Sequence, residues 1–133
     1  MDAAAAARAW VDGWSKGWPA QDAEAIAALY VEDASFRSHP FREPHRGAAG
    51  VREYCEWAFA DEEKPTECWF GEPRLTGDGA VVEYWAVITS GGTEHTLAGI
   101  SVLDFAADGR VQAQRDYWTM EEGRRDRPLG WGG

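Results

Sequence analysis

The order of the periodic patterns along the chain is what most constrains its fold. Gly17 and Pro19 are expected to end a first helix. Tyr30 is expected to belong to the apolar stripe of a second helix. Residues 31–46 contain two prolines and predict a short strand followed by a loop. Apolar residues recur at three- and four-residue steps in the first half, which predicts amphipathic helices over about 7–18, 22–30 and 48–60.

The second half of the chain reads as β structure. Glycine-containing turns, such as Gly91-Gly92 and Asp108-Gly109, separate segments rich in strand-forming residues. These segments predict strands over 67–75, 80–90, 93–105 and 110–119. Helices followed by an antiparallel meander predict an α+β domain, with three N-terminal helices packed on one face of a mostly antiparallel sheet.

Length and composition favour one small domain. We expect it over residues 1–120, with 121–133 as a loose tail rich in charge, glycine and proline. A net charge of −10 argues against nucleic acid or an anionic membrane as partner, because both need a basic surface. No stretch approaches the roughly 18 apolar residues of a membrane span, and the N-terminus lacks a signal-peptide pattern. A cytoplasmic location is therefore expected.

An acidic residue in the last predicted strand is the strongest candidate for chemistry. The segment V-Q-A-Q-R-D-Y-W-T places Asp116 on one face with Gln112, Gln114 and Trp118, and Arg115 on the other. Aspartate is depleted in strands, so Asp116 either faces water or lines a pocket. The polar residues on the same face favour a solvent-exposed position for Asp116. The eight tryptophans of the chain favour an aromatic-lined pocket or an interface.

Three strings spread over about residues 5–120 carry a family resemblance. They are A-E-A-I-A-A-L-Y-V-E-D-A-S-F, R-G-A-A-G-V-R-E-Y, and G-I-S-V-L-D-F-A-A-D-G-R-V followed by R-D-Y-W. These strings resemble the nuclear transport factor 2-like superfamily, whose fold is a cone built on a curved sheet. Within it, the chain looks most similar to SnoaL-like polyketide cyclases and ketosteroid-isomerase-like proteins. Such a fold hosts many chemistries, so the resemblance implies the fold and not one activity.

The resemblance also implies that the working groups of the steroid isomerases are changed. Their general-base aspartate aligns with His39, their oxyanion-hole tyrosine with Trp14 and their protonated aspartate with Ser101, so steroid isomerisation is not expected. The cyclases carry an acid/base aspartate on the last strand, at the position of Asp116, and in this fold that position lines the cone interior. Arg115 and Asp116 do not form the Asp–Arg–Asp set of limonene-type epoxide hydrolases, because adjacent strand residues face opposite ways.

Two histidines are further candidates for chemistry. His39 lies at the predicted mouth of the cone, where an imidazole suits a general base or a hydrogen-bond partner, although a surface loop position is equally ordinary. His95 shares strand parity with Ser101 and would be a second polar group in the pocket if that face is inward. The histidines show no metal-ligand spacing, and no nucleotide, phosphate-loop or nucleophile motif is present. No metal and no cofactor are expected.

The rest of the expected pocket is mostly aromatic. Both faces of strand 80–90 are mixed, so the pattern leaves open which of them points inward. The residues expected to contact a small hydrophobic ligand are Trp14, Tyr30, Phe36, Trp57, Trp69, Trp85, Ser101 and Trp118.

Three functional hypotheses fit these observations. The favoured one is a cofactor-independent cyclase or isomerase in which Asp116, assisted by His39 or His95, moves a proton next to the carbonyl of a flat apolar substrate. The second is a non-catalytic protein that binds a small hydrophobic ligand. The third is a dimerising interaction domain without a ligand. Ile100 and Val102 have the parity of the outer sheet face, which predicts a homodimer through that face in any of the three.

Overall fold

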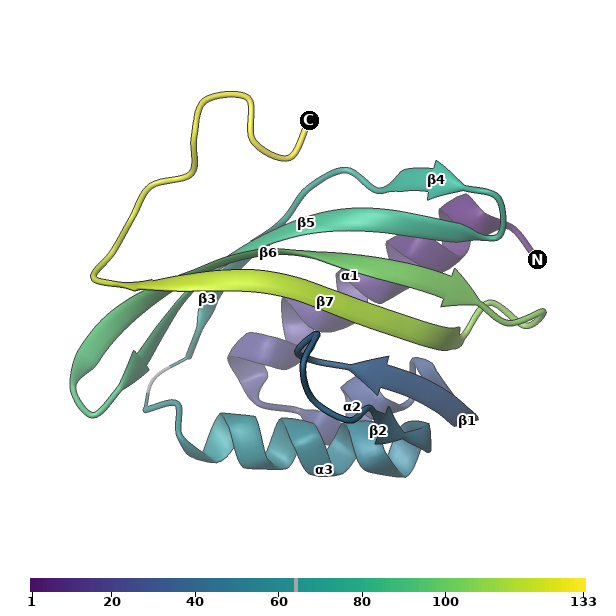
Figure 1. The fold of residues 1–133 in the computed structure, drawn as a ribbon, viewed down its shortest axis with the longest axis horizontal. Coiled ribbons are helices and arrows are strands. Elements are labelled where there is room, and N and C mark those ends of the chain that lie inside the picture. The colour runs from purple at the N-terminus through teal and green to yellow at the C-terminus, as the bar shows by residue number, and fades with distance from the viewer. Residues whose placement is uncertain (64) are drawn as a thin grey trace.

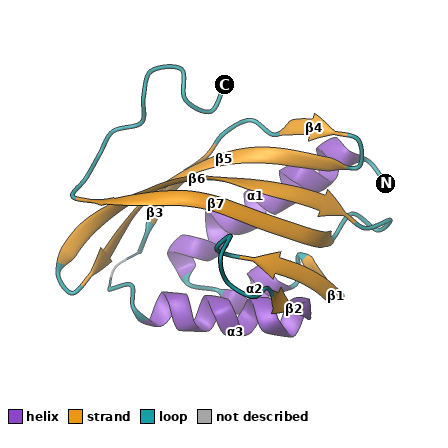
Figure 2. Cartoon of the chain, in the orientation of Figure 1, coloured by secondary structure: helices purple, strands orange, loops and turns teal. Residues whose placement is uncertain are grey.

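The computed structural model describes residues 1–63 and 65–133, and Figure 1 shows their path. Three helices lie on one side of a single curved sheet (Figure 2). In the described part of the chain, no helix is both long and apolar enough to cross a membrane. The elements are α1 (Ala3–Ala20), α2 (Ala23–Ala27), β1 (Tyr30–Arg37), β2 (His45–Arg46), α3 (Gly47–Ala60), β3 (Glu67–Phe70), β4 (Arg74–Thr76), β5 (Gly79–Ser90), β6 (Thr93–Phe105) and β7 (Val111–Glu122).

The sheet has the strand order β2-β1-β7-β6-β5-β3, and β4 pairs with β5. All pairs are antiparallel except β1 with β7, which is parallel. The long central strands curve around the helices (Figure 1). The predicted α+β class, with three helices on a curved and mostly antiparallel sheet, is confirmed.

Helix α1 extends beyond both of its expected limits. At its start, the Asp2 carboxylate accepts a hydrogen bond from the backbone N–H of Ala4 at 2.9 Å, which caps the helix. The helix runs past Gly17 and includes Pro19, and it ends where Gln21 takes a left-handed conformation with φ 54°. Gly17 is a point of close approach instead of a stop, because a Cβ there would lie 2.6 Å from Cγ1 of Ile26.

The second helix is much shorter than its periodicity predicts. It ends at Ala27, and the chain enters β1 at Tyr30. Tyr30 thus belongs to a strand and not to a helical stripe, and its side chain is only 1% exposed. The short apolar run fits either helix or strand, and pairing of β1 with β7 decides in favour of the strand.

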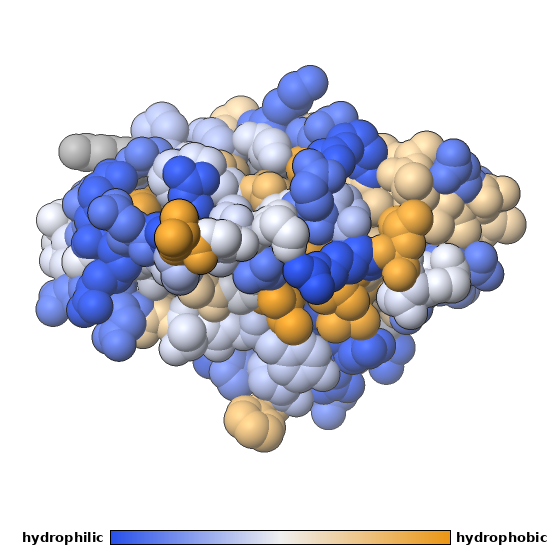
Figure 3. Space-filling model, turned by 90° about the horizontal axis from the view of Figure 1, so that it is seen from above, coloured by the Kyte–Doolittle hydropathy of each residue, from blue (hydrophilic) through white to orange (hydrophobic). Residues whose placement is uncertain are grey.

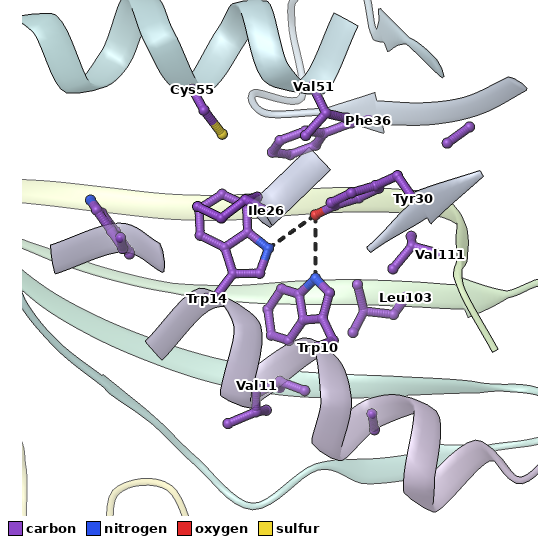
Figure 4. Close-up of a cluster of buried hydrophobic side chains, with 14 of the residues drawn as sticks. Trp10, Val11, Trp14, Ile26, Tyr30, Phe36, Val51, Cys55, Leu103 and Val111 are labelled. Carbon is purple, nitrogen blue, oxygen red and sulfur yellow. Dashed lines mark hydrogen bonds between the residues drawn. The ribbon is translucent and has the colours of Figure 1, made fainter. Parts of the chain in front are cut away.

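The core lies between the helices and the inner face of the sheet. Even-numbered residues of β5, such as Val82 and Tyr84, point into it, and Leu103 of β6 is fully buried beside them. Figure 4 shows Ile26 of α2 and Val51 of α3 approaching from the helical side. The even-numbered residues of strand 80–90 therefore face inward, which answers the question that the sequence pattern left open.

The C-terminal segment packs on the outer face of the sheet, although it was expected to be loose. Trp85 of β5 points outward and its indole N–H donates to the carbonyl of Arg125 at 3.0 Å. Trp131 packs against Trp85 with ring centroids 6.2 Å apart, and the guanidinium of Arg127 lies 4.2 Å over the ring of Trp69. Figure 3 looks onto this side and shows hydrophilic residues beside hydrophobic ones.

Candidate functional site

A cavity of about 590 Å³ lies between the inner face of the sheet, α1 and α3. Its volume is that of a site for a small organic ligand. Polar groups are few and are concentrated on β7, on the loop after β1 and at the end of α3. The wall is mainly aromatic and is formed by Trp10, Trp14, Trp18, Phe36, Tyr54, Trp57, Phe59, Phe70, Tyr84 and Trp118.

Asp116 lies in the wall of this cavity, in the middle of β7. The alternation of the strand points it inward with the buried Gln114, while Arg115 between them is exposed. Its Oδ1 accepts a hydrogen bond from Oγ of Ser101, directly opposite on β6, at 2.7 Å, and another from Nε2 of Gln114 at 2.9 Å. Among the residues that the structure describes, none donates to Oδ2. That oxygen is the one left for a ligand.

Burial holds the pKa of Asp116 far above its ordinary value. Removal from water raises this pKa and outweighs the hydrogen bonds from Gln114 and Ser101, which lower it, so that the pKa rises from 3.8 to about 7. Because Oδ1 already accepts two hydrogen bonds, the proton of the neutral acid belongs on Oδ2. The group is therefore able to take or give a proton near neutral pH, through one defined oxygen.

A buried polar network fixes the orientation of Gln114. Its Oε1 accepts from the hydroxyl of Tyr30 at 2.5 Å and from the indole N–H of Trp10 at 3.1 Å, so its amide N–H must face Asp116. The Tyr30 hydroxyl in turn accepts from the indole of Trp14 at 3.1 Å (Figure 4). Burial raises the pKa of Tyr30 well above its usual range, which keeps the hydroxyl protonated and able to donate. Tyr30 supports the wall from behind and does not line the cavity.

His39 and Trp118 lie together at the mouth of the cavity. Their rings are 5.6 Å apart, and the Trp118 indole N–H donates to the carbonyl of Ser38 at 2.7 Å, which ties β7 to the loop after β1. Nδ1 of His39 accepts from the backbone N–H of Phe41 at 3.2 Å. A neutral His39 therefore carries its proton on Nε2 and acts as a donor. Trp57 lines the same region and is 69% exposed.

Besides Tyr30, three residues expected in the pocket lie elsewhere. Trp69 and Trp85 are paired neighbours on β3 and β5 whose side chains contact the C-terminal segment on the outer face. Both faces of this part of the sheet are covered, so aromatic residues occur on both. His95 has the expected inward parity, but it lies near the β5–β6 turn and is not part of the cavity wall. Trp14, Phe36 and Ser101 do line the cavity.

The structure adds polar groups that sequence reasoning missed. Gln114 has the strand parity of Asp116, a signal that could have identified it as a partner. Glu62 follows α3 and lines the cavity, where its carboxylate accepts from the indole N–H of Trp18 at 3.1 Å. Burial raises the pKa of Glu62 above its usual value. No periodicity marks Glu62, because it lies beyond the end of a helix.

The sequence of the chain matches a known protein family. A model of the SnoaL-like domain matches residues 7–114, so the chain belongs to the SnoaL-like family of the nuclear transport factor 2-like superfamily. The family resemblance of the sequence is thereby confirmed. Among curated proteins, the chain is similar to a steroid Delta-isomerase of Nocardioides simplex, with 29% identity over 115 residues that cover 86% of this chain and 88% of the relative.

Solved structures show the same fold. The epoxide hydrolase/cyclase-like enzyme SalBIII, which is associated with pyran ring formation in the polyether salinomycin, superposes with a TM-score of 0.75 at 17% identity, over 87% of this chain and 95% of that one. RV0760c of Mycobacterium tuberculosis superposes with a TM-score of 0.77 at 16% identity, over 89% of this chain and 96% of that one. A protein of Catenulispora acidiphila with a ketosteroid isomerase-like fold, in complex with trimethylamine, superposes with a TM-score of 0.72 at 15% identity, over 81% of this chain and 83% of that one. These identities establish the fold alone.

Proposed function

We propose that this protein is a cofactor-independent cyclase or isomerase that moves a proton on a flat, apolar, carbonyl-containing molecule. One observation carries the proposal: a carboxyl group with a pKa of about 7 presents a single free oxygen to an aromatic cavity. A general acid or base is most effective when its pKa is near the working pH. The name of one sequence relative, a steroid Delta-isomerase, supports an isomerase, and the shared fold of an epoxide hydrolase/cyclase-like enzyme is compatible with a cyclase.

In the proposed reaction, ionised Asp116 removes a proton from a carbon next to the ligand carbonyl. The C–H bond breaks, an O–H bond forms at Oδ2, and the electron pair moves onto the carbonyl oxygen as an enolate. In this proposal His39, which lines the same cavity, donates its Nε2 proton in a hydrogen bond that stabilises that oxygen. Where a C=C bond is conjugated with the enolate, return of the proton from Oδ2 to the far end of this dienolate gives an isomer. Attack of the enolate carbon on a second carbonyl carbon of the same molecule forms a C–C bond and closes a ring; the π bond of that carbonyl breaks, and its oxygen takes the proton from Oδ2.

Proton exchange on a simple ketone tests this proposal. 2-Tetralone is flat and apolar, and its acidic C–H bonds lie next to a carbonyl. In D2O, NMR should show protein-dependent exchange of these protons, with a rate that rises through a pH of about 7 and then levels off, because the base must be ionised. The Asp116→Asn variant should still bind the ketone, but it should no longer accelerate the exchange. Asp12→Asn, which removes an exposed carboxylate of α1, is the matched control.

The alternative function is non-catalytic binding of a small hydrophobic ligand in the same cavity. The aromatic wall supports binding in either case. If the unmodified protein binds 2-tetralone and neither it nor Asp116→Asn accelerates exchange, the protein is a binder, and a weaker affinity of Asp116→Asn identifies Asp116 as a polar anchor.

We also propose a homodimer through the outer face of the sheet. The C-terminal segment packs on β3 and β5, and the outer surface of β6 and β7 lies beside it. There Ile100 is 36% exposed and pairs with Tyr117, which is 43% exposed. Val102 continues the row on the same face and is half-buried. Neighbouring apolar side chains on an exposed sheet face suit a two-fold contact.

A further inference from the structure

Glu62 places a second carboxylate in the cavity wall, at the end of α3. Its Oε1 accepts from the indole N–H of Trp18 at 3.1 Å and from the hydroxyl of Thr66. Its backbone carbonyl accepts from the side-chain amide of Gln21 at 3.1 Å. Contacts from α1, from the turn after it and from the segment before β3 therefore hold Glu62 in place.

The carboxylate of Glu62 has acceptor capacity beyond these bonds. An ionised carboxylate offers about four lone-pair positions. The two close donors both reach Oε1, and the contact of Oε2 with Trp18 is long, at 3.4 Å. The donors themselves are nearly buried, with Trp18 9% and Thr66 3% exposed. Oε2 is thus the less occupied oxygen of a group that faces the ligand space.

The two carboxyl groups belong to different regions of the cavity. Trp14 is hydrogen-bonded into the Asp116 network, and Trp18, one helical turn later on α1, is hydrogen-bonded to Glu62. The four residues from Trp14 to Trp18 advance about 6 Å along the helix. The Trp14 and Trp18 rings meet edge to face at 6.0 Å, so an apolar aromatic wall separates the two polar positions. A flat ligand along this wall would meet one carboxyl group at each end.

We propose that Glu62 is a second ligand anchor, which binds a hydroxyl or amine group at the end of the ligand remote from Asp116. An ionised carboxylate only accepts hydrogen bonds, so the ligand must supply a donor there. A ligand carboxylate is disfavoured at that end, because Asp61 also lines the cavity next to Glu62. The inference rests on the proposed function, since it concerns the ligand of the same cavity. It narrows that ligand to an apolar carbonyl compound with a remote donor.

The test compares four probes on one scaffold: 2-naphthylmethylamine, 2-naphthalenemethanol, 2-methylnaphthalene and 2-naphthoate. All binding is measured at pH 8 by calorimetry in the Asp116→Asn protein, so that the amine cannot bind to Asp116 instead of Glu62. We expect the amine to bind about tenfold more tightly than 2-methylnaphthalene, which corresponds to about 1.4 kcal/mol. The alcohol should bind with intermediate affinity and the carboxylate most weakly.

Adding Glu62→Gln should remove the preference for the amine. Glutamine keeps an oxygen for Trp18 and Thr66, so a purely structural role of Glu62 would leave the order of affinities unchanged. The control is Glu63→Gln, which removes the neighbouring charge while keeping an acceptor for the backbone N–H of Gly92. An unchanged amine preference in Glu62→Gln, or an equal loss in Glu63→Gln, would overturn the proposal.

A second measurement does not depend on the stability of the Glu62 variant. In the ¹³C-labelled Asp116→Asn protein, the Glu62 carboxyl resonance should shift on addition of the amine and remain in place with 2-methylnaphthalene. A resonance that ignores the bound amine would refute the anchor. Because these experiments measure binding without turnover, failure of ketone exchange would disprove the proposed reaction and leave this inference standing.

Discussion

The stability of the protein should report the protonation of Asp116. The pKa is about 7 in the folded protein, against an ordinary 3.8. Between these pH values the folded chain holds a proton that the unfolded chain has released, so the free energy of unfolding must fall as pH rises. Each pH unit is worth about 1.4 kcal/mol, which gives a total of about 4 kcal/mol by pH 8. Solvent that reaches the carboxyl through the cavity reduces this, and we expect about 2 to 4 kcal/mol.

Replacing Asp116 by Asn should remove this pH dependence. The amide oxygen still accepts from Ser101 and Gln114, and no charge has to be buried. In urea denaturation, Asp116→Asn and the unmodified protein should have similar free energies of unfolding near pH 4.5. The variant should be the more stable by about 2 to 4 kcal/mol at pH 8. Asp12→Asn should follow the unmodified protein throughout. A difference that stays constant from pH 5 to pH 8.5 would refute the buried, protonated Asp116.

Three other substitutions test separate parts of the structure. Gln114→Leu removes a hydrogen bond that favours the ionised carboxylate, so it should raise the pKa of Asp116 above about 7. A ¹³C NMR titration measures this pKa, and an unchanged value would contradict the hydrogen-bond network. Gly99→Ala places a Cβ 2.7 Å from the hydroxyl of Tyr84, so chemical denaturation should show a loss of about 1 to 3 kcal/mol. Ile100→Lys should convert the proposed dimer to monomer in sedimentation, and an unmodified protein that is monomeric at micromolar concentration would disprove that dimer.

The arrangement of the elements was predictable because it depends on local patterns. Turn glycines mark the ends of the long strands, and residues 48–60 have a clear helical period. The predicted length of the second helix was wrong because a short apolar run fits a helix and a strand equally. The strand β7, whose pairing with β1 decides between them, lies far away in the chain. Gly17 was misread as a helix stop because its contact with Ile26 is tertiary.

The site was less predictable than the fold, since it depends on contacts between elements. Alternation showed that Asp116 and Gln114 share a face, but only the folded structure shows Tyr30 behind them. Trp85 was expected in the cavity because the sequence does not show that the C-terminal segment covers the other face. Glu62 carries no pattern at all, and its position follows from the way α1 and α3 meet.

The parallel pairing of β1 with β7 has a consequence for how the protein folds. Tyr30 and Gln114, which hold the Asp116 wall in place, are 84 positions apart in the chain. Joining such distant segments costs loop-closure entropy before any contact compensates for it, and contacts of this range slow folding. β7 also completes the sheet between β1 and β6. In a chain still emerging from the ribosome, the helices and the β5–β6 hairpin are therefore synthesised before β7, and the binding cavity can form only after β7 has paired with β1.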